Sequence, residues 1–391
     1  MQSSSELYQV LKDHVNSDGL PIIQEGHFQV LTQKYSKDVF RDTLATFIAT
    51  ERPPFPLKEI SIHDMEDCFK QLRSEKHTKS LITDADVMEK FDDYQYPYST
   101  HGLGVNDASS KFNLASNYFC QDLRLSCGSY GFRAPIEVWN NGNPKDIWKC
   151  LGPIWRGING VSKDKDANLI GGSLQKSSYI SAFRLGTYIA TQFKPLVAKS
   201  IYEMTNATKV LDTSCGWGDR LCGFFASSAT EYIGCDPNPN TYERYQQECV
   251  EYERILGFEG NPIVESNEKF FKSQGKKTVT IYRCGAEDLP WESISGIDCA
   301  FTSPPYFSTE EYNKGGEHQE DQSWAKFNEY ESWRDNFYLP VSQKTLDSLS
   351  ETGIMMINIL DPKVKGKRYR SGDELVDMLK DNFISLFITY N

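Results

Sequence analysis

The chain of 391 residues is 39% hydrophobic and 25% charged, the composition of an ordinary folded protein with one full-size domain and a smaller one. Its formal net charge of −12 at pH 7 argues against general coating of nucleic acid, because nonspecific phosphate binding needs a basic surface or patch. The sequence has no apolar run of about 18 residues and no amino-terminal signal pattern, so it predicts neither a membrane span nor secretion.

The first 95 residues are expected to be mainly helical. Apolar residues recur at helical spacing in residues 7–15 and 65–72, and Pro53-Pro54-Phe55-Pro56 separates the two stretches. Residues 96–178 are richer in Gly, Asn, Ser and aromatic residues, which is typical of long loops, irregular strands or a surface connector. This region is the candidate for target recognition. Its aromatic residues suit either stacking surfaces or core packing: Tyr96, Tyr98, Phe119, Tyr130, Phe132, Trp139 and Trp155.

Residues 179–391 show an α/β pattern. Short apolar segments predict strands, and helical patterns lie between several of them, which favours a parallel sheet with crossover helices. In such sheets, ligands bind at the carboxyl ends of the strands. The motifs described next all follow predicted strands. Those strands cover residues 209–212, 231–235, 279–282, 298–301, 354–359 and 384–388.

A glycine turn and two acidic strand ends suggest a cofactor site. Gly216 and Gly218 follow the first of these strands and precede a helix, so the backbone there can approach a ligand closely. Asp236 ends the next strand about 20 residues further on, where a carboxylate can accept hydrogen bonds from a ribose diol. Glu287 and Asp288 follow a third strand and are suited to an adenine amino group.

These three segments resemble the successive cofactor motifs of class I S-adenosylmethionine (SAM) dependent methyltransferases. The resemblance covers residues 179–391 and implies a Rossmann-like sheet that binds SAM, with residues 183–195 packed over the cofactor. A dehydrogenase is the competing interpretation, but the turn lacks G-x-G-x-x-G spacing because Leu221 stands at the third glycine position. The residues that the resemblance implies in cofactor binding are Phe193, Asp212, Ser214, Cys215, Gly216, Gly218, Asp236, Pro237, Asn238, Glu287, Asp288 and Thr302.

The most specific motif, residues 302–307, ends the fourth strand and reads Thr-Ser-Pro-Pro-Tyr-Phe. It resembles the [D/N/S]-P-P-[Y/F/W] signature of methyltransferases that modify exocyclic amines. An aromatic amine is a poor nucleophile because its lone pair is delocalised. If the Ser303 side chain and the Pro304 carbonyl accept its two N–H groups, the nitrogen can pyramidalise and direct its lone pair at the methyl group. Pro304 and Pro305 fix the backbone, and Tyr306 offers a stacking face for an everted base. These four residues are the predicted catalytic set.

Substrate contacts are expected from the segments that follow. Phe307 adjoins the catalytic motif, and residues 308–324 form a polar loop that suits either a mobile lid or an ordinary insertion. A basic run follows the fifth strand and would emerge on the same edge of the sheet, where it can bind phosphates. We therefore expect a nucleic acid, and DNA above all, as substrate. The basic residues are Lys363, Lys365, Lys367, Arg368 and Arg370.

The sequence leaves the identity of the amine open. The serine of the motif resembles cytosine-N4 enzymes, whereas the order of the motifs, with the SAM motif first, resembles adenine-N6 enzymes. RNA guanine N2, a protein glutamine amide and a noncatalytic nucleic-acid-binding subunit are the alternatives. Cytosine-C5 methylation is disfavoured because no cysteine nucleophile lies between Thr302 and Glu310. Target recognition falls to the amino-terminal region or to a partner protein.

The ten cysteines and six histidines show no metal-binding arrangement. No C-x-x-C pair occurs, and the histidines do not lie at ligand spacing from the cysteines. We therefore expect reduced thiols, no metal site and a cytoplasmic protein.

Overall fold

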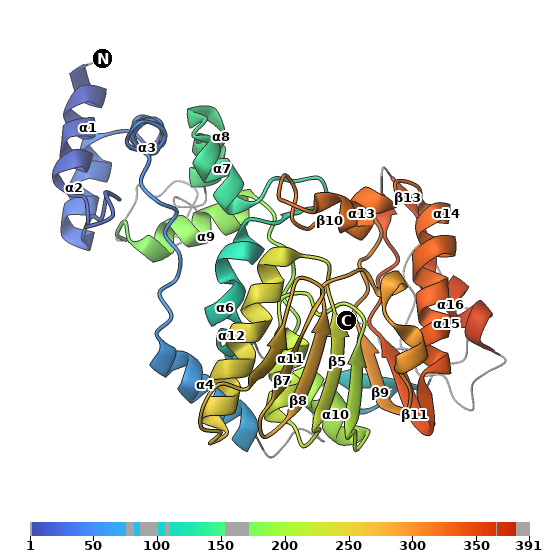
Figure 1. Ribbon diagram of the computed structural model, residues 1–391. Coiled ribbons are helices and arrows are strands. Elements are labelled where there is room, and N and C mark those ends of the chain that lie inside the picture. Colours follow the sequence, from blue (N-terminus) through green and yellow to red (C-terminus); the bar gives the residue numbers. More distant parts are fainter. Residues whose placement is uncertain are drawn as a thin grey trace. The chain divides into compact units, whose positions relative to one another are not determined.

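A computed structural model describes residues 2–75, 82–86, 101–105, 110–152, 172–364 and 366–380 (Figure 1). The predicted strand at 384–388, Lys365 and three of the candidate aromatic residues, Tyr96, Tyr98 and Trp155, lie outside these ranges. The chain forms two compact units that alternate along the sequence. The first comprises Met1–Glu59 and Gln121–Ala190, and the second comprises Ile60–Cys120 and Thr191–Asn391. Composition along the chain does not reveal this alternation.

The first unit is built from helices. Ser36 begins α3 by accepting a hydrogen bond from the Val39 amide at 3.4 Å, and Pro135 and Pro144 occupy first-turn positions that need no amide proton. The core of the unit centres on Trp139, whose Nε1 donates to the Pro53 carbonyl at 2.7 Å. The helices are α1 (Gln2–Asp13), α2 (Glu25–Lys34), α3 (Lys37–Glu51), α7 (Pro135–Asn141), α8 (Pro144–Leu151) and α9 (Lys176–Gly186).

Helices also occupy much of the region that was expected to be loops or irregular strands. Within its described part, α6 (Leu114–Leu125), α7 and α8 are all helical. The Asn and Pro residues that suggested loops act instead as helix starts, since the Asn143 side chain accepts from the Lys145 amide at 3.0 Å. Phe119 and Trp139 are buried in the core, as the packing alternative expected, whereas Tyr130 and Phe132 are exposed.

The second unit is an α/β fold around a seven-stranded, mostly parallel sheet of order β11-β9-β4-β5-β8-β7-β6 (Figure 1). Its five parallel strands confirm the five predicted strands that lie within the described residues. Three of these five are buried along most of their length, as strands covered on both faces must be. The strands are β4 (Lys209–Asp212), β5 (Glu231–Cys235), β6 (Ile263–Ser266), β7 (Phe270–Gln274), β8 (Thr278–Tyr282), β9 (Ile297–Thr302) and β11 (Leu349–Ile357).

The hairpin β6–β7 was not predicted. It pairs antiparallel with the sheet edge at β8, and only alternate residues of β7 are buried, so its sequence is too polar to stand out as a strand. The helices of this unit are α4 (Ile62–Ser74), α10 (Pro195–Met204), α11 (Asp219–Ala226), α12 (Pro239–Ile255), α13 (Ser323–Lys326), α14 (Tyr330–Trp333), α15 (Leu339–Asp347) and α16 (Ser371–Leu379). Among the described helices, none combines the length and the apolar character needed to cross a bilayer.

Two buried lysines close helix ends in the second unit. Lys199 Nζ donates to the carbonyls of Leu72 and Arg73 at 2.9 and 3.0 Å and so caps the end of α4. Lys277 Nζ donates to the carbonyls of Phe224 and Ser227, both at 2.7 Å, at the end of α11. These contacts satisfy carbonyls that have no partner within the helix and place positive charge at the negative end of its dipole. The far end of α11 is the glycine turn, so this contact helps to fix the candidate site.

Candidate functional site

The glycine turn joins β4 to α11 and requires glycine at both positions. Gly216 and Gly218 have φ values of +59° and +79°, in the left-handed region. A Cβ atom on Gly218 would lie 1.9 Å from Glu248 Oε1, so a larger residue there would force the buried Glu248 side chain to move. The Cys215 amide donates to the Cys235 carbonyl at 2.9 Å, which ties the turn to the end of β5. The turn is therefore held close against the second strand.

Asp236 follows β5 and lies beside this turn. Its carboxylate accepts from the Gly216 amide at 2.9 Å and from the Asn238 amide at 3.0 Å. Burial raises the pKa of Asp236 to about 6, although the two amide hydrogen bonds oppose that shift. The Asn238 side chain accepts from the Asn240 amide at 3.1 Å and caps α12, with Pro239 at the first helical position. The predicted residues 216, 236 and 238 therefore form one connected group.

Asp212 is surrounded by hydrogen-bond donors of its own chain. Its side chain is fully buried and accepts hydrogen bonds from Arg220 Nε at 2.8 Å, Tyr232 OH at 2.7 Å and the Ser214 amide at 3.1 Å. Arg220 also donates to the Ser214 carbonyl. Its guanidinium carbon lies 5.7 Å from the centroid of the Phe193 ring. The buried ion pair of Asp212 and Arg220 holds the start of the glycine turn through hydrogen bonds to the backbone of Ser214. Direct contact of Asp212 with a cofactor stays a prediction.

The third acidic strand end contacts the segment that follows the catalytic motif. Lys326 Nζ donates to Glu287 Oε1 at 2.6 Å and to Asp288 Oδ2 at 3.2 Å. Glu287 Oε2 is buried and has no hydrogen-bond partner among the described residues. An oxygen in this state can accept a hydrogen bond from a ligand amino group, because a buried acceptor without a donor is otherwise costly.

The predicted catalytic motif, residues 302–307, lies where β9 and β11 end. Thr213 Oγ1 donates to Thr302 Oγ1 at 3.1 Å, which joins the ends of β4 and β9. Asn358 follows β11, and its Nδ2 donates to both Ser303 Oγ at 3.0 Å and Tyr306 OH at 2.7 Å. The Asn358 amide also donates to the Thr302 carbonyl at 2.9 Å. Asn358 thus orients two of the predicted catalytic side chains, a role that the sequence analysis missed. The sequence feature that could have indicated this role is an amide residue, Asn358, directly after the strand that pairs with β9.

Of the carbonyls of Pro304 and Pro305, one has no hydrogen-bond donor among the described residues. Among the described residues, none donates a hydrogen bond to the Pro304 carbonyl, whereas the Pro305 carbonyl accepts from the Phe307 amide at 3.0 Å. Burial raises the pKa of the Tyr306 phenol. The loop therefore presents a hydroxyl that is already oriented and a carbonyl that has no partner in the described chain.

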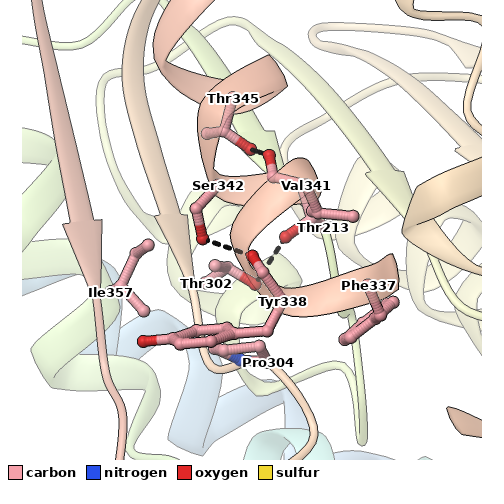
Figure 2. Close-up of a pocket in the computed structure, with 9 residues that line it drawn as sticks. All are labelled: Thr213, Thr302, Pro304, Phe337, Tyr338, Val341, Ser342, Thr345 and Ile357. Atoms are coloured by element: carbon pink, nitrogen blue, oxygen red, sulfur yellow. Dashed lines mark hydrogen bonds between the residues drawn. The ribbon is translucent and has the colours of Figure 1, made fainter. Parts of the chain in front are cut away.

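A small cavity lies behind the loop, between the strand ends and the helix that precedes β11 (Figure 2). Its volume of about 10 Å³ is at the lower limit for one water molecule. A π-helical turn, Arg334–Tyr338, brings aromatic side chains to it just before Pro340, which lacks the amide proton that a regular helix needs. The lining residues are Thr213, Thr302, Pro304, Phe337, Tyr338, Val341, Ser342, Thr345 and Ile357. Pro304 is thus supported by packed side chains on its inner side.

The segment after the motif contacts the cofactor half of the site. The Tyr312 ring lies 5.6 Å from the ring of Trp217, the residue between the two turn glycines. Asn240 Nδ2 donates to Asn313 Oδ1 at 3.0 Å, and Trp324 Nε1 donates to the Tyr312 carbonyl at 2.8 Å. Together with Lys326, these contacts connect residues 308–326 to all three predicted cofactor segments. Whether the segment moves as a lid stays a prediction.

Phe307 and the basic run differ in exposure. Phe307 is buried, 5% exposed, among the rings of Tyr330 and Tyr369. The basic run forms a short hairpin of β12 (Lys363–Val364) and β13 (Lys367–Arg368). Its described basic side chains, those of Lys363, Lys367, Arg368 and Arg370, are all exposed. Phe307 is therefore a packing residue of the loop in this structure, and phosphate binding by the hairpin stays a prediction.

Glu310 is a buried acid close to the catalytic loop. It is 8% exposed, and its Oε1 accepts from the Thr191 amide at 3.2 Å and from the Thr191 hydroxyl at 3.4 Å. Burial raises its pKa from 4.5 to about 7 against these two hydrogen bonds. The protonated acid therefore favours the folded state. Its stabilising contribution is complete below about pH 4.5 and is lost as the pH rises through about 7.

We expect Glu310→Gln to remove this pH dependence. The wild type should lose up to roughly 3 kcal/mol of unfolding free energy relative to the variant between about pH 5 and about pH 8. Urea unfolding of both proteins at the two pH values measures the difference, and other titrating groups cancel because both proteins share them. A stability difference that does not change with pH would contradict the assignment.

Comparison of the chain with protein-family models, with curated proteins and with solved structures found no match.

Proposed function

We propose that this protein is a class I SAM-dependent methyltransferase that transfers a methyl group to an exocyclic amino nitrogen of a nucleobase, in DNA above all. The observation that carries the proposal is the pair of contacts made by Asn358. They orient Ser303 and Tyr306 at the carboxyl edge of the sheet, beside a Pro304 carbonyl that has no donor in the described chain. Such an arrangement suits recognition of an amine through its two N–H groups.

The residues of the cofactor half fit SAM by the chemistry of their side chains. The Asp236 carboxylate has accepting capacity beyond its two amide hydrogen bonds, which suits a ribose diol. Glu287 Oε2, buried without a partner, suits an adenine amino group. The glycine turn allows close approach of backbone. When bound, SAM supplies an electrophilic methyl group on its sulfonium sulfur.

The chain's own groups then prepare the nucleophile. Ser303 Oγ and the Pro304 carbonyl accept the two N–H bonds of the target amine, so its nitrogen pyramidalises and regains a directed lone pair. Asn358 Nδ2 donates to Ser303 Oγ and so keeps the remaining lone pair of that oxygen directed at the amine. Tyr306 provides the face against which the target base stacks. Methyl transfer would break the carbon–sulfur bond of the sulfonium and leave a neutral thioether, and the methylated nitrogen would give up one proton to solvent.

The direct test is incubation with labelled SAM and separate pools of duplex DNA, single-stranded DNA, RNA and protein, followed by mass spectrometry of the digested nucleosides and peptides. We expect N4-methylcytosine or N6-methyladenine from DNA. Label found in RNA guanine or in protein glutamine alone would assign the same chemistry to another substrate. Absence of SAM binding would remove the proposal.

Asp236→Asn tests the cofactor half separately. The carboxylate form accepts more hydrogen bonds than the neutral acid, so SAM binding by the wild type should strengthen as the pH rises through about 6. We expect the variant to bind SAM about 10- to 100-fold more weakly at neutral pH, because hydrogen bonds to a charged group are lost, and to show no such pH dependence. Calorimetry at several pH values measures both effects. Asp347→Asn, at an exposed acid on α15, is the matched control. Unchanged affinity would exclude the ribose role.

A further inference from the structure

A strained turn in the first unit displays aromatic side chains. Ser129 and Phe132 exchange backbone hydrogen bonds of 3.2 and 2.9 Å around Tyr130 and Gly131, whose φ values are +52° and +76°. Positive φ at both central positions defines a type I′ turn, in which Asn-Gly and Asp-Gly are the favoured pairs. A tyrosine at the first central position is conformationally unfavourable, because its Cβ crowds the backbone there. The fold therefore retains Tyr130 at a position that suits Asn better.

The aromatic side chains of this turn are exposed and gather with residues that follow α9. Tyr130 is 38% exposed and Phe132 is 62% exposed. The Tyr188 ring lies 4.9 Å from the Tyr130 ring and 6.3 Å from the Phe132 ring, with an interplanar angle of 18° to the latter. Leu185, at the end of α9, is 69% exposed. The rings of Tyr130 and Phe132, with the half-buried ring of Tyr188 between them, thus form a surface cluster near Leu185 in the sequence, which we call the aromatic patch.

Cations border the aromatic patch. Arg133 directly follows Phe132 and pairs with Asp146 at 2.6 Å, and Lys149 pairs with the same carboxylate at 3.2 Å. Arg41 donates to the carbonyl of Lys149 at 3.1 Å. The Gly186 backbone, next to Leu185, lies against Cys150, the residue after Lys149. Arg133 and Lys149 therefore pair with one acid, and Arg41 is bonded to the backbone of Lys149, in a chain whose net charge is −12.

We propose that the aromatic patch binds unpaired nucleobases of a single-stranded or locally opened nucleic acid, with Arg41, Arg133 and Lys149 close to the phosphates. Exposed rings beside cations are the combination that single-stranded nucleic acid binds, since bases stack on the rings and the backbone follows the positive charge. The choice of nucleic acid as the ligand rests on the proposed function. The patch gives that function a contact outside the catalytic loop.

Tyr130→Asn separates stacking from folding. Asn-Gly is a favoured type I′ pair, so the variant should unfold at the same urea concentration as the wild type or at a higher one. Loss of one stacking ring should weaken binding of a fluorescein-labelled single-stranded DNA oligonucleotide about tenfold in fluorescence anisotropy. If Tyr130 had only a structural role, Tyr130→Asn would leave the stability unchanged or higher and would not weaken DNA binding. Phe132→Ser is expected to weaken binding to a similar extent.

Val30→Ser is the matched control, because Val30 is 58% exposed on α2 of the same unit and lies outside the aromatic patch. The proposal would be overturned if both aromatic variants bound DNA as tightly as the Val30→Ser control does. It would also be overturned if the wild type bound no single-stranded DNA or bound only protein. Binding is measured without SAM, so it is independent of methyl transfer. If Tyr130→Asn weakens binding but the wild type methylates no nucleic acid, the patch stands and the proposed function fails. If both variants bind DNA normally and the wild type methylates DNA, the proposed function stands and the proposed role of the aromatic patch fails.

Discussion

Replacement of Ser303 by Ala is expected to lower the rate of methyl transfer by about two to three orders of magnitude while leaving the affinity for SAM unchanged. In the proposed mechanism the Ser303 hydroxyl accepts one of the two N–H groups of the target amine. The other hydroxyl bonded to Asn358 belongs to Tyr306, whose ring is assigned to stacking. Single-turnover kinetics with saturating SAM measures the rate, and calorimetry measures cofactor binding.

Ser308→Gly is the control for this prediction. Ser308 lies in the same loop, is exposed and has a φ of +48°, so glycine removes a hydroxyl there without backbone strain. Asn358→Ala should also lower the rate of methyl transfer, but less than Ser303→Ala does. The Ser303 hydroxyl remains in this variant and loses only the hydrogen bond that orients it. Full turnover by Ser303→Ala with intact SAM binding would remove Ser303 from the catalytic set.

Replacement of Arg220 by Met is expected to reduce the free energy of unfolding by about 3–5 kcal/mol, because it leaves the Asp212 carboxylate buried without its cation. Asp212 is fully buried and Arg220 is 4% exposed, so water cannot replace the lost partner in the folded state. Tyr232 OH and the Ser214 amide still donate to Asp212, but they carry no compensating charge. Urea unfolding measures the change.

The comparison for this prediction is an exposed arginine of the same unit. Arg254 pairs with Glu66 at 3.2 Å and with Glu251 at 3.0 Å, and about half of its side chain is exposed. Arg254→Met should cost less than about 1 kcal/mol. Adding Asp212→Asn to Arg220→Met should restore part of the loss, since the unpaired buried charge disappears. Equal effects of Arg220→Met and Arg254→Met would show that the buried pair does not carry the stability assigned to it.

Local sequence patterns were sufficient for the central sheet and for the backbone of the site. Four of the five described strands that were predicted are compact apolar segments, and the glycines at 216 and 218 stand where left-handed backbone is needed. The acidic residue at 236 was predicted at the end of the second strand, and it directly follows β5. These features depend on residues that are close together in the sequence, so local sequence patterns are sufficient to predict them.

The remainder depends on contacts between distant segments. Asn358 lies 55 residues from Ser303 in sequence, and only the parallel pairing of β9 and β11 brings the two together. Glu310 is polar and was part of a loop in the sequence pattern, yet contacts with Thr191 bury it. Asp212 was expected at the cofactor, and its hydrogen-bond partners include Arg220, in the first turn of the next helix, and Tyr232 on a neighbouring strand. Such partners have no periodic signature.

The alternation of the two units along the chain determines where the protein can be cut. A fragment that begins at residue 179, as the sequence division suggests, would lose the carbonyls that hold the buried Lys199 ammonium. It would also lose Ser116, which donates to buried Asp219, and the Ala115 carbonyl that accepts from Tyr252. A fragment that contains the α/β sheet should therefore retain residues 60–120 as well.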